Sequence, residues 1–200
     1  DLAREALGDL EPDAVIDKAA DMVAEAARAT LGRAGIEKGV ELYCFGGNGG
    51  NFAARVADRL YLDRAYVFAL GPVLSAFGSA VSEICHVYEE WGDDHDAIIA
   101  RGKDQVMRDL AGEADVRIEV EITDHVTVRG YAPVPLYEPQ PREGETHRVS
   151  GDVLVWEDLK PGAMASGPVR LESDTNTCTI PAGWAVRIDG YDNATLQREA

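Results

Sequence analysis

The segment that most constrains the fold is Tyr43–Phe52, where a short apolar stretch leads directly into a glycine-rich run. Val40–Phe45 has the length and composition of a buried strand, and a helical pattern begins at about Asn51. Between them stand Gly46, Gly47, Gly49 and Gly50. Glycine lets the backbone turn tightly and approach a ligand, and the first turn of a helix presents unpaired amides with partial positive charge. The run therefore predicts a strand, a glycine loop and a helix N-terminus, an arrangement that receives phosphate.

The loop matches neither of the common phosphate-binding signatures. It lacks the Lys-Ser/Thr pair of a P-loop, and Phe52 stands where G-x-G-x-x-G requires its last glycine. A second interpretation therefore stays open, in which the glycines only form a tight turn of an α/β domain. Asn48 and Asn51 are candidates for hydrogen bonds to ribose or phosphate, and Asn51 equally fits the N-cap of the helix that follows.

The charge balance excludes several classes of partner. The chain has 36 acidic and 19 basic residues, a formal net charge of −17. Such a charge repels nucleic acid and anionic membranes, so we expect neither as a partner. An anionic nucleotide would need local positive potential from backbone amides, a divalent metal or a partner chain. The acidity is equally compatible with a role in solubility alone.

The cysteines indicate a reducing compartment. Cys44, Cys85 and Cys178 are odd in number and far apart, and two of them lie in apolar surroundings. This favours free thiols in a cytoplasmic protein over a disulfide framework. The sequence has no signal peptide, no lipidation motif and no apolar run of about twenty residues, so we expect no membrane association. Because it starts with Asp1, it is either a processed chain or part of a longer protein.

The N-terminal half predicts an alternation of helices and strands. We expect a helix from Pro12 to about Leu31, the strand Val40–Phe45, a helix over Asn51–Leu60 and a strand over Ala65–Leu70 that ends at Gly71-Pro72. This α-β-α-β order is typical of an open α/β sheet, whose ligands gather at the carboxyl ends of the strands. The alanine-rich face of the first helix predicts close packing, most naturally on a sheet. Leu74–Val87 is left undecided, and a helix is expected over Asp94–Leu110.

From Asp115 the periodicity changes to that of strands. Val116–Ile122 alternates apolar and charged residues, Val126–Tyr131 is its expected partner, and short strand candidates follow from Val153 to Leu196. Pro181–Trp184 reads as a turn with an anchoring aromatic residue. We therefore predict the α/β class, with an open α/β half-domain over residues 1–113 followed by a small β-rich C-terminal module over residues 114–200.

No metal site is predicted from these residues. No C-x-x-C pair exists, and His86, His95, His125 and His147 are scattered along the chain. Asp93-Asp94-His95-Asp96 has the composition of a cation site, but acidic residues before a helix usually interact with its N-terminus.

Three segments in matching order resemble the C-terminal third of the hydantoinase A / 5-oxoprolinase family of ATP-dependent enzymes. They are Phe45-Gly46-Gly47-Asn48-Gly49; Val73–Gly78 followed by Glu83 and His86; and Gly167-Pro168 with Glu172–Thr177 and Pro181-Ala182-Gly183-Trp184. The resemblance covers roughly residues 12–90 and 150–197, and its case depends on the order and spacing of the segments. It departs from most relatives at Gly50-Asn51-Phe52, where a conserved histidine is absent, and at Cys85, where arginine is frequent.

The resemblance implies an actin-like or sugar-kinase-like half-domain with a nucleotide site. The nucleotide-binding residues would be Gly46, Gly47, Asn48, Gly49, Gly50 and Asn51. His86 with Glu83 would be a metal-linked or proton-handling pair, although a lone histidine in an apolar stretch is more often a core residue. ATP and Mg (or Mn) would be bound mostly by a missing N-terminal part or a partner subunit. The implied partners are the N-terminal part of hydantoinase A and a hydantoinase B-like subunit.

Asn48 and the sequence Ser75-Ala76-Phe77-Gly78 look closer to the ketone carboxylase branch, which uses ATP to join a ketone and bicarbonate. The implied function is a component, either subunit or C-terminal domain, of an ATP-dependent ketone carboxylase. Two alternatives stay open: a component of an ATP-dependent cyclic amide hydrolase, and a non-catalytic docking subunit. Because members of this family run to several hundred residues and their N-terminal part carries much of the nucleotide and metal site, we expect the isolated chain to be inactive.

Overall fold

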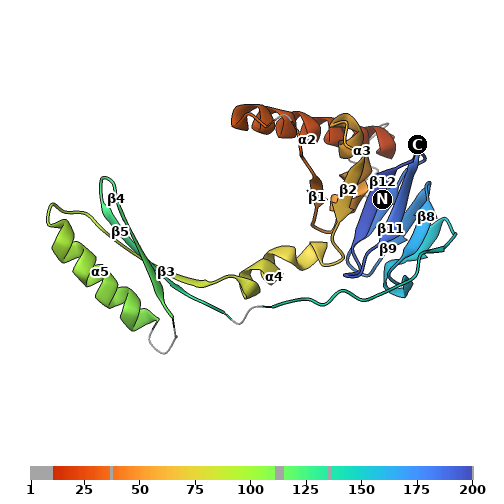
Figure 1. Ribbon diagram of the computed structural model, residues 1–200. Helices are drawn as coiled ribbons and strands as arrows, with labels where there is room; N and C mark the ends of the chain where they lie inside the picture. Colours follow the sequence, from red (N-terminus) through yellow and green to blue (C-terminus); the bar gives the residue numbers. More distant parts are fainter. Residues whose placement is uncertain (1–10, 37, 111–114, 135–136, 200) are drawn as a thin grey trace. The chain divides into compact units, whose positions relative to one another are not determined.

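A computed structural model describes residues 11–36, 38–110, 115–134 and 137–199 of the chain. The chain forms two compact units, and Figure 1 labels most of their elements. The larger unit combines Asp1–Leu74 with Pro139–Ala200, and the smaller unit is Ser75–Glu138. The predicted α/β class is confirmed, because helices and several sheets are built from one chain. No described helix is long and apolar enough to cross a membrane.

Two sheets and two helices make up most of the larger unit. Its helices are α2 (Pro12–Ala34) and α3 (Gly49–Arg59), with short 3-10 turns η1 (Gly71–Val73) and η2 (Trp156–Asp158). Its strands are β1 (Leu42–Cys44), β2 (Arg64–Val67), β6 (His147–Arg148), β7 (Val153–Val155), β8 (Ala163–Ser166), β9 (Val169–Glu172), β10 (Thr177–Ile180), β11 (Trp184–Ile188) and β12 (Ala194–Arg198). The first sheet has the order β1-β2-β12-β11-β8-β6 and the second the order β10-β9-β7.

The C-terminal strands extend the sheet that the N-terminal strands begin. β1 and β2 are parallel, and β12 lies antiparallel to β2, with Leu196 opposite Ala65. The C-terminal residues are thus β-rich, and the last strand is hydrogen-bonded directly to the N-terminal α/β part. The predicted boundary between residues 113 and 114 lies outside the described residues.

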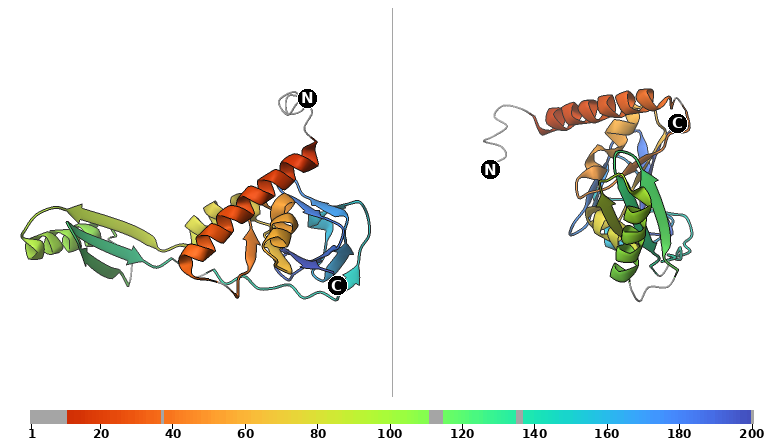
Figure 2. Two further views of the ribbon diagram at one scale, coloured as in Figure 1. Left: turned by 90° about the horizontal axis from the view of Figure 1, so that it is seen from above. Right: turned by 90° about the vertical axis from the view of Figure 1, so that its left-hand side faces the viewer.

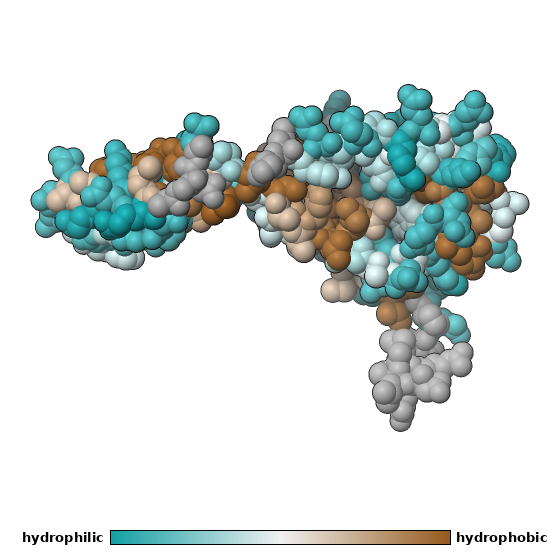
Figure 3. Space-filling model, turned by 90° about the horizontal axis from the view of Figure 1, so that it is seen from below, coloured by the Kyte–Doolittle hydropathy of each residue, from teal (hydrophilic) through white to brown (hydrophobic). Residues whose placement is uncertain are grey.

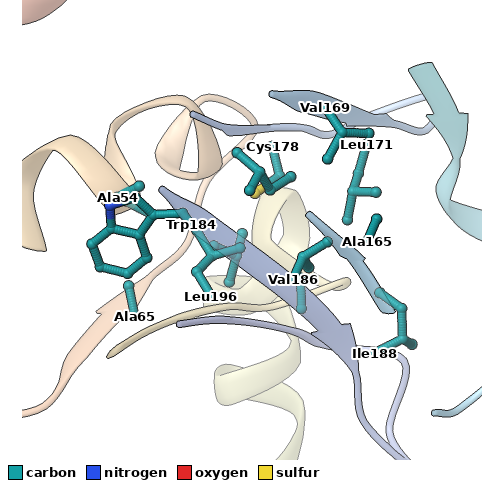
Figure 4. Close-up of a cluster of buried hydrophobic side chains, with 14 of the residues drawn as sticks. Ala54, Ala65, Ala165, Val169, Leu171, Cys178, Trp184, Val186, Ile188 and Leu196 are labelled. Carbon is teal, nitrogen blue, oxygen red and sulfur yellow. The ribbon is translucent and has the colours of Figure 1, made fainter. Parts of the chain in front are cut away.

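The hydrophobic core of the larger unit lies against one face of the six-stranded sheet. Alanines of α3 and residues of the second sheet pack there on Ala65, Val186 and Leu196 (Figure 4). Trp184 is the largest fully buried side chain, and its amide donates to the carbonyl oxygen of Pro181 at 3.2 Å. The prediction of a turn with an anchoring aromatic at Pro181–Trp184 is therefore confirmed.

Helix α2 packs on helix α3, so the prediction that its alanine-rich face covers a sheet was wrong. In Figure 2, α2 lies along α3 in the view from above. Ala20 and Ala24 are fully buried, and their small side chains allow two helices to approach closely. Salt bridges account for the packing of α2 on α3. Arg55 of α3 binds Asp17 of α2 at 2.8 Å, and Arg59 of α3 also binds carboxylates of α2.

The smaller unit is a three-stranded sheet with one helix on it. It contains α4 (Leu74–Val81), β3 (Ile84–Glu90), α5 (His95–Asp109), β4 (Arg117–Ile122) and β5 (Val126–Ala132). The undecided segment Leu74–Val87 is thus a helix followed by the start of a strand. The strand order is β3-β5-β4, and α5 packs against β5. A methyl group at Gly130 would lie within 2.0 Å of Val106 of α5, so glycine is needed for this close contact.

The contact between α2 and α3 predicts an acid-dependent loss of stability. A hydrogen bond from Arg55 holds the pKa of Asp17 below its ordinary value of 3.8. Because the folded pKa is lowered, this carboxylate stabilises the folded chain above about pH 4, and that contribution disappears as the pH falls through the folded pKa. We expect Asp17→Asn to lose less stability than the wild type between about pH 4 and pH 2, in urea unfolding followed by circular dichroism.

Asp174→Asn is the matched control, because no described arginine pairs with this exposed carboxylate of the same unit. It should keep the wild-type acid profile. Identical profiles for the wild type and Asp17→Asn would contradict the assigned role of the Asp17–Arg55 pair.

Candidate functional site

The glycine loop connects β1 to α3 at the point where β1 and β2 end. The amide of Gly46 donates to the carbonyl oxygen of Gly71 at 2.8 Å, and the amide of Phe68 donates to Cys44 at 3.3 Å. Gly46 has φ of +83°, a left-handed conformation that favours glycine. The predicted meeting of the glycine loop and Gly71-Pro72 at the carboxyl ends of the strands is therefore confirmed.

The turn between β9 and β10 supports the loop from the other side. The amide of Thr177 donates to the carbonyl oxygen of Gly47 at 3.4 Å, and the side-chain amide of Asn176 donates to the carbonyl oxygen of Phe68 at 3.1 Å. Asn176 is 3% exposed, and its Oδ1 accepts no hydrogen bond from the part of the chain that the structure describes. Its side chain thus ties the end of β2 to this turn, a role that sequence reasoning missed because the bond joins residues 108 positions apart.

The packing of the loop accounts for three of its four glycines. Gly46 has a positive φ, and a methyl group on Gly47 would lie 3.1 Å from the carbonyl oxygen of Thr175. At Gly50 the methyl group would lie 2.6 Å from the carbonyl oxygen of Thr177 and 2.8 Å from the Cα of Cys178. At Gly49 it would make only ordinary contacts of 3.5 Å or more with Cys44. The glycine pattern is therefore largely a requirement of the fold.

The N-terminus of α3 nevertheless has the properties of an anion site. Helix α3 begins at Gly49 with Asn48 as the N-cap, and no acidic residue stands in its first turn. Among the described residues, none accepts a hydrogen bond from the amides of Gly47, Asn48 or Gly50. Unpaired amides at a helix start carry partial positive charge and bind anions. In a chain of net charge −17, a first helical turn without a carboxylate favours an anion at these amides.

Asn51 is not the N-cap, which corrects the prediction. It lies in the first turn of α3, and its side-chain oxygen accepts a hydrogen bond from the hydroxyl of Thr179 in β10 at 2.8 Å. The helix starts two residues earlier than predicted because the close contact of Gly50 with β10 places Gly49 and Gly50 inside the helix. Asn48 is exposed and makes no side-chain cap, so it is the asparagine available for a ligand.

Exposed apolar side chains lie at the same ends of the strands. Phe45, Leu70 and Val73 are each more than half exposed, at 58%, 52% and 52%. Figure 3 shows apolar surface among hydrophilic side chains on the larger unit. Apolar surface beside a few polar groups is the usual composition of a ligand site.

Glu83 and His86 do not form the pair expected for a catalytic role. Both lie in the smaller unit, where His86 Nε2 is 2.9 Å from Asp109 Oδ2 and Glu83 pairs with Arg117 at 3.0 Å. Each therefore has its own structural partner. The prediction of a shared proton-handling pair at these two residues finds no support in these contacts.

The described residues provide no group of three or more histidine, cysteine, aspartate or glutamate side chains suited to a metal ion. In the segment Asp93–Asp96, Asp94 is the N-cap of α5, and its carboxylate accepts a hydrogen bond from the amide of Ala97 at 3.1 Å. The sequence left two interpretations of this segment, a cation site and a helix N-terminus. The geometry supports the helix N-terminus.

Comparison with known proteins shows the fold. No family model matches the sequence, and neither does any curated protein. A nucleotide-free structure of acetone carboxylase, from work on ATP-dependent acetone carboxylation, aligns over 98% of this chain with a TM-score of 0.72 at 17% identity. An ATP-dependent caprolactamase from Pseudomonas jessenii aligns over 80% with a TM-score of 0.53 at 15% identity. This chain spans 41% and 36% of those two chains, respectively.

The contacts of the loop predict opposite effects for two neighbouring glycines. We expect Gly50→Ala to lower the free energy of unfolding by about 1–3 kcal/mol, because the added methyl group meets the backbone of β10. Gly49→Ala is the matched control and should be neutral or stabilising by up to about 1 kcal/mol, since alanine is preferred to glycine in a helix. Urea unfolding measures both, and equal effects of the two substitutions would contradict the loop geometry.

The two cysteines beneath the loop should react slowly with alkylating agents. Burial raises the pKa of Cys44 to about 11, and burial also raises the pKa of Cys178. At pH 8 the thiolate fraction of Cys44 is then about one in a thousand. We expect iodoacetamide to modify exposed Cys85 first, Cys44 much later and Cys178 last, as followed by peptide mass spectrometry. Early modification of Cys178 would show that the core beneath the loop opens.

Proposed function

We propose that this chain is a component of an ATP-dependent ketone carboxylase, to which it contributes the glycine loop as one wall of the nucleotide site. The observation that carries the proposal is the N-terminus of α3, with three unpaired amides and no acidic residue in its first turn. The fold supports it, because the similar acetone carboxylase is an ATP-dependent enzyme. In this role the amides of Gly47, Asn48 and Gly50 hold phosphate oxygens, and Asn48 adds a side-chain hydrogen bond.

The rest of the site comes from outside the described residues. ATP brings three phosphates and a divalent ion, Mg or Mn, and the described residues contain no carboxylate cluster for that ion. A companion subunit or another part of a longer polypeptide therefore supplies the metal ligands and the reacting groups. The isolated chain is inactive on this proposal, and its three free cysteines suit the cytoplasm.

A component of an ATP-dependent cyclic amide hydrolase is the second candidate. The observation that favours it is the alignment with the caprolactamase, whose substrate class is a cyclic amide. Both candidates place the same loop at the nucleotide, so they differ in the acceptor that ATP activates. A docking subunit without catalysis is the third possibility, in which assembly does not depend on nucleotide.

Substitution of Asn48 separates nucleotide binding from folding. Aspartate and serine are both good N-caps, so Asn48→Asp and Asn48→Ser should keep the thermal stability of the wild type or raise it slightly. Asn48→Asp places a negative charge within about 4 Å of the bound phosphates, which costs several kcal/mol at an effective dielectric constant of about 20. We expect it to weaken binding of Mg-ATP to the complete assembly by about tenfold or more.

Asn48→Ser is the matched control and should change the affinity by only a few-fold. Titration calorimetry with Mg-ATP measures both variants in the assembly from the natural source. Equal nucleotide affinity of the wild type and Asn48→Asp would remove the loop from the nucleotide site and leave the docking role. ATP hydrolysis by the assembly then separates the first two candidates. Hydrolysis that requires a ketone and bicarbonate supports the carboxylase, and hydrolysis that requires a cyclic amide supports the amide hydrolase.

A further inference from the structure

Helix α5 covers one face of the three-stranded sheet in the smaller unit. It packs on the face that carries the even-numbered residues of β5, such as Val126 and Val128 (Figure 1). Because side chains alternate along a strand, the odd-numbered residues of β5 lie on the other face. His125 belongs to that set, and Trp91, the residue that follows β3, lies beside it. We call this second face the outer face.

Trp91 exposes a large aromatic surface at one end of the outer face. It is 64% exposed, and its ring stacks on the imidazole of His125, with centroids 4.7 Å apart and ring planes 24° apart. The two nitrogens of that imidazole point at carboxylates. Nδ1 is 2.8 Å from Asp124 Oδ1, and Nε2 is 3.8 Å from Glu89 Oε1. The stacking therefore holds an exposed indole close to two acidic side chains.

The two carboxylates beside Trp91 have the capacity to bind a cation. No described arginine or lysine forms an ion pair with Glu89 or Asp124, and each directs only one oxygen at His125. His125 adds a positive charge only when it is protonated. Arg129 lies within electrostatic reach of Glu89, but its ion pair is with Glu121 at 2.8 Å. A cation at Trp91 would thus meet negative charge that no ion pair with a described arginine or lysine neutralises.

Two other aromatic rings of the chain show which cation fits such a place. At the far end of the outer face, the guanidinium of Arg117 lies over the ring of Tyr131 at 4.2 Å and pairs with Glu83 at 3.0 Å. In the larger unit, the guanidinium of Arg198 lies over the ring of Trp184 at 5.2 Å and also pairs with a carboxylate. In both places an arginine of the chain itself joins an aromatic face to a carboxylate.

We propose that Trp91 binds an arginine of a companion protein, with Glu89 and Asp124 as the carboxylates that pair with its guanidinium. Trp91 has the same kind of neighbours as the other two rings, but no described arginine lies over it. Arginine suits this place better than lysine, because a planar guanidinium stacks on an indole and hydrogen-bonds a carboxylate at the same time. Val87, which is 45% exposed on the same face, provides apolar contact beside the arginine.

The charge of the chain favours a different protein over a second copy as the occupant. At a net charge of −17, two copies repel each other, whereas a basic segment of another protein is attracted. Tryptophan and arginine are also enriched among the residues that contribute most to binding at protein interfaces. The inference does not depend on nucleotide binding by the glycine loop, because the residues that carry it all lie in the smaller unit.

Oxidation of tryptophan tests the inference on the full chain, alone and in the assembly from the natural source. Trp156 and Trp184 are 4% and 2% exposed, so N-bromosuccinimide should oxidise Trp91 first in the isolated chain. In the assembly we expect the oxidation of Trp91 to slow several-fold, as followed by peptide mass spectrometry. The two buried tryptophans are the internal control and should react slowly in both samples. Equal oxidation of Trp91 in the two samples would overturn the inference.

A site-specific photo-crosslink identifies the occupant. Benzoylphenylalanine at Val87 should crosslink, in the assembly, to a segment of another protein that has an arginine within a few residues. Benzoylphenylalanine at Met107, which is 48% exposed on α5, is the matched control and should not give that product. A crosslink to a second copy of this chain, to the same polypeptide, to a segment without arginine, or to nothing would contradict the proposal.

Substitutions then separate binding from folding. Trp91→Ala and Glu89→Arg should each leave the urea midpoint of the chain unchanged, because both residues are exposed, and should weaken binding of the crosslinked companion about tenfold or more in titration calorimetry. Asp104→Arg makes the same change of charge on exposed α5 and should have no effect. Replacing the arginine of the companion by glutamate should restore binding to the Glu89→Arg variant. Failure of this rescue, or wild-type affinity of Trp91→Ala, would show that the arginine does not bind at Trp91.

Discussion

The larger unit depends on one close contact, that of the first turn of α3 with the backbone of β10. Gly50 makes the contact possible, since any side chain there would overlap Thr177 and Cys178. Once α3 is seated on β10, the glycine loop must run between the ends of β1 and β2 and the turn after β9. Asn176 then bridges that turn to Phe68. The shape of the candidate site thus follows from helix packing, and the free amides of the loop are a consequence of it.

Electrostatics limits where an anionic ligand can bind a chain of net charge −17. Acidic residues of α2 are engaged by Arg55 and Arg59, which hold the two helices together. The first turn of α3 contains no acidic residue, and its unpaired amides favour an anion there.

Local elements could be predicted from the sequence where periodicity and turn residues agree. Helices α2, α3 and α5 and strands β1, β2, β4 and β5 lie within a few residues of the predicted ranges. The prediction was incomplete at Leu74–Val87, because its small residues have no clear period, and at β8, because Ala163–Ser166 is short and lacks the β-branched residues typical of strands. The N-cap was placed at Asn51 because asparagine is a good cap, whereas the contact of Gly50 with β10 starts the helix earlier.

The sequence by itself determined the α/β class, the strand that leads into a glycine loop, the acidic surface and the unpaired cysteines. Each of these follows from composition or from neighbours along the chain. Only the tertiary structure decided that β12 pairs with β2, that Asn176 supports the loop, that His86 and Glu83 have separate partners, and that Trp91 stacks on His125. These features join residues that are far apart in sequence, as in the bond between Asn176 and Phe68. Local propensity carries no information on such pairs, because they are selected by the burial of one shared core.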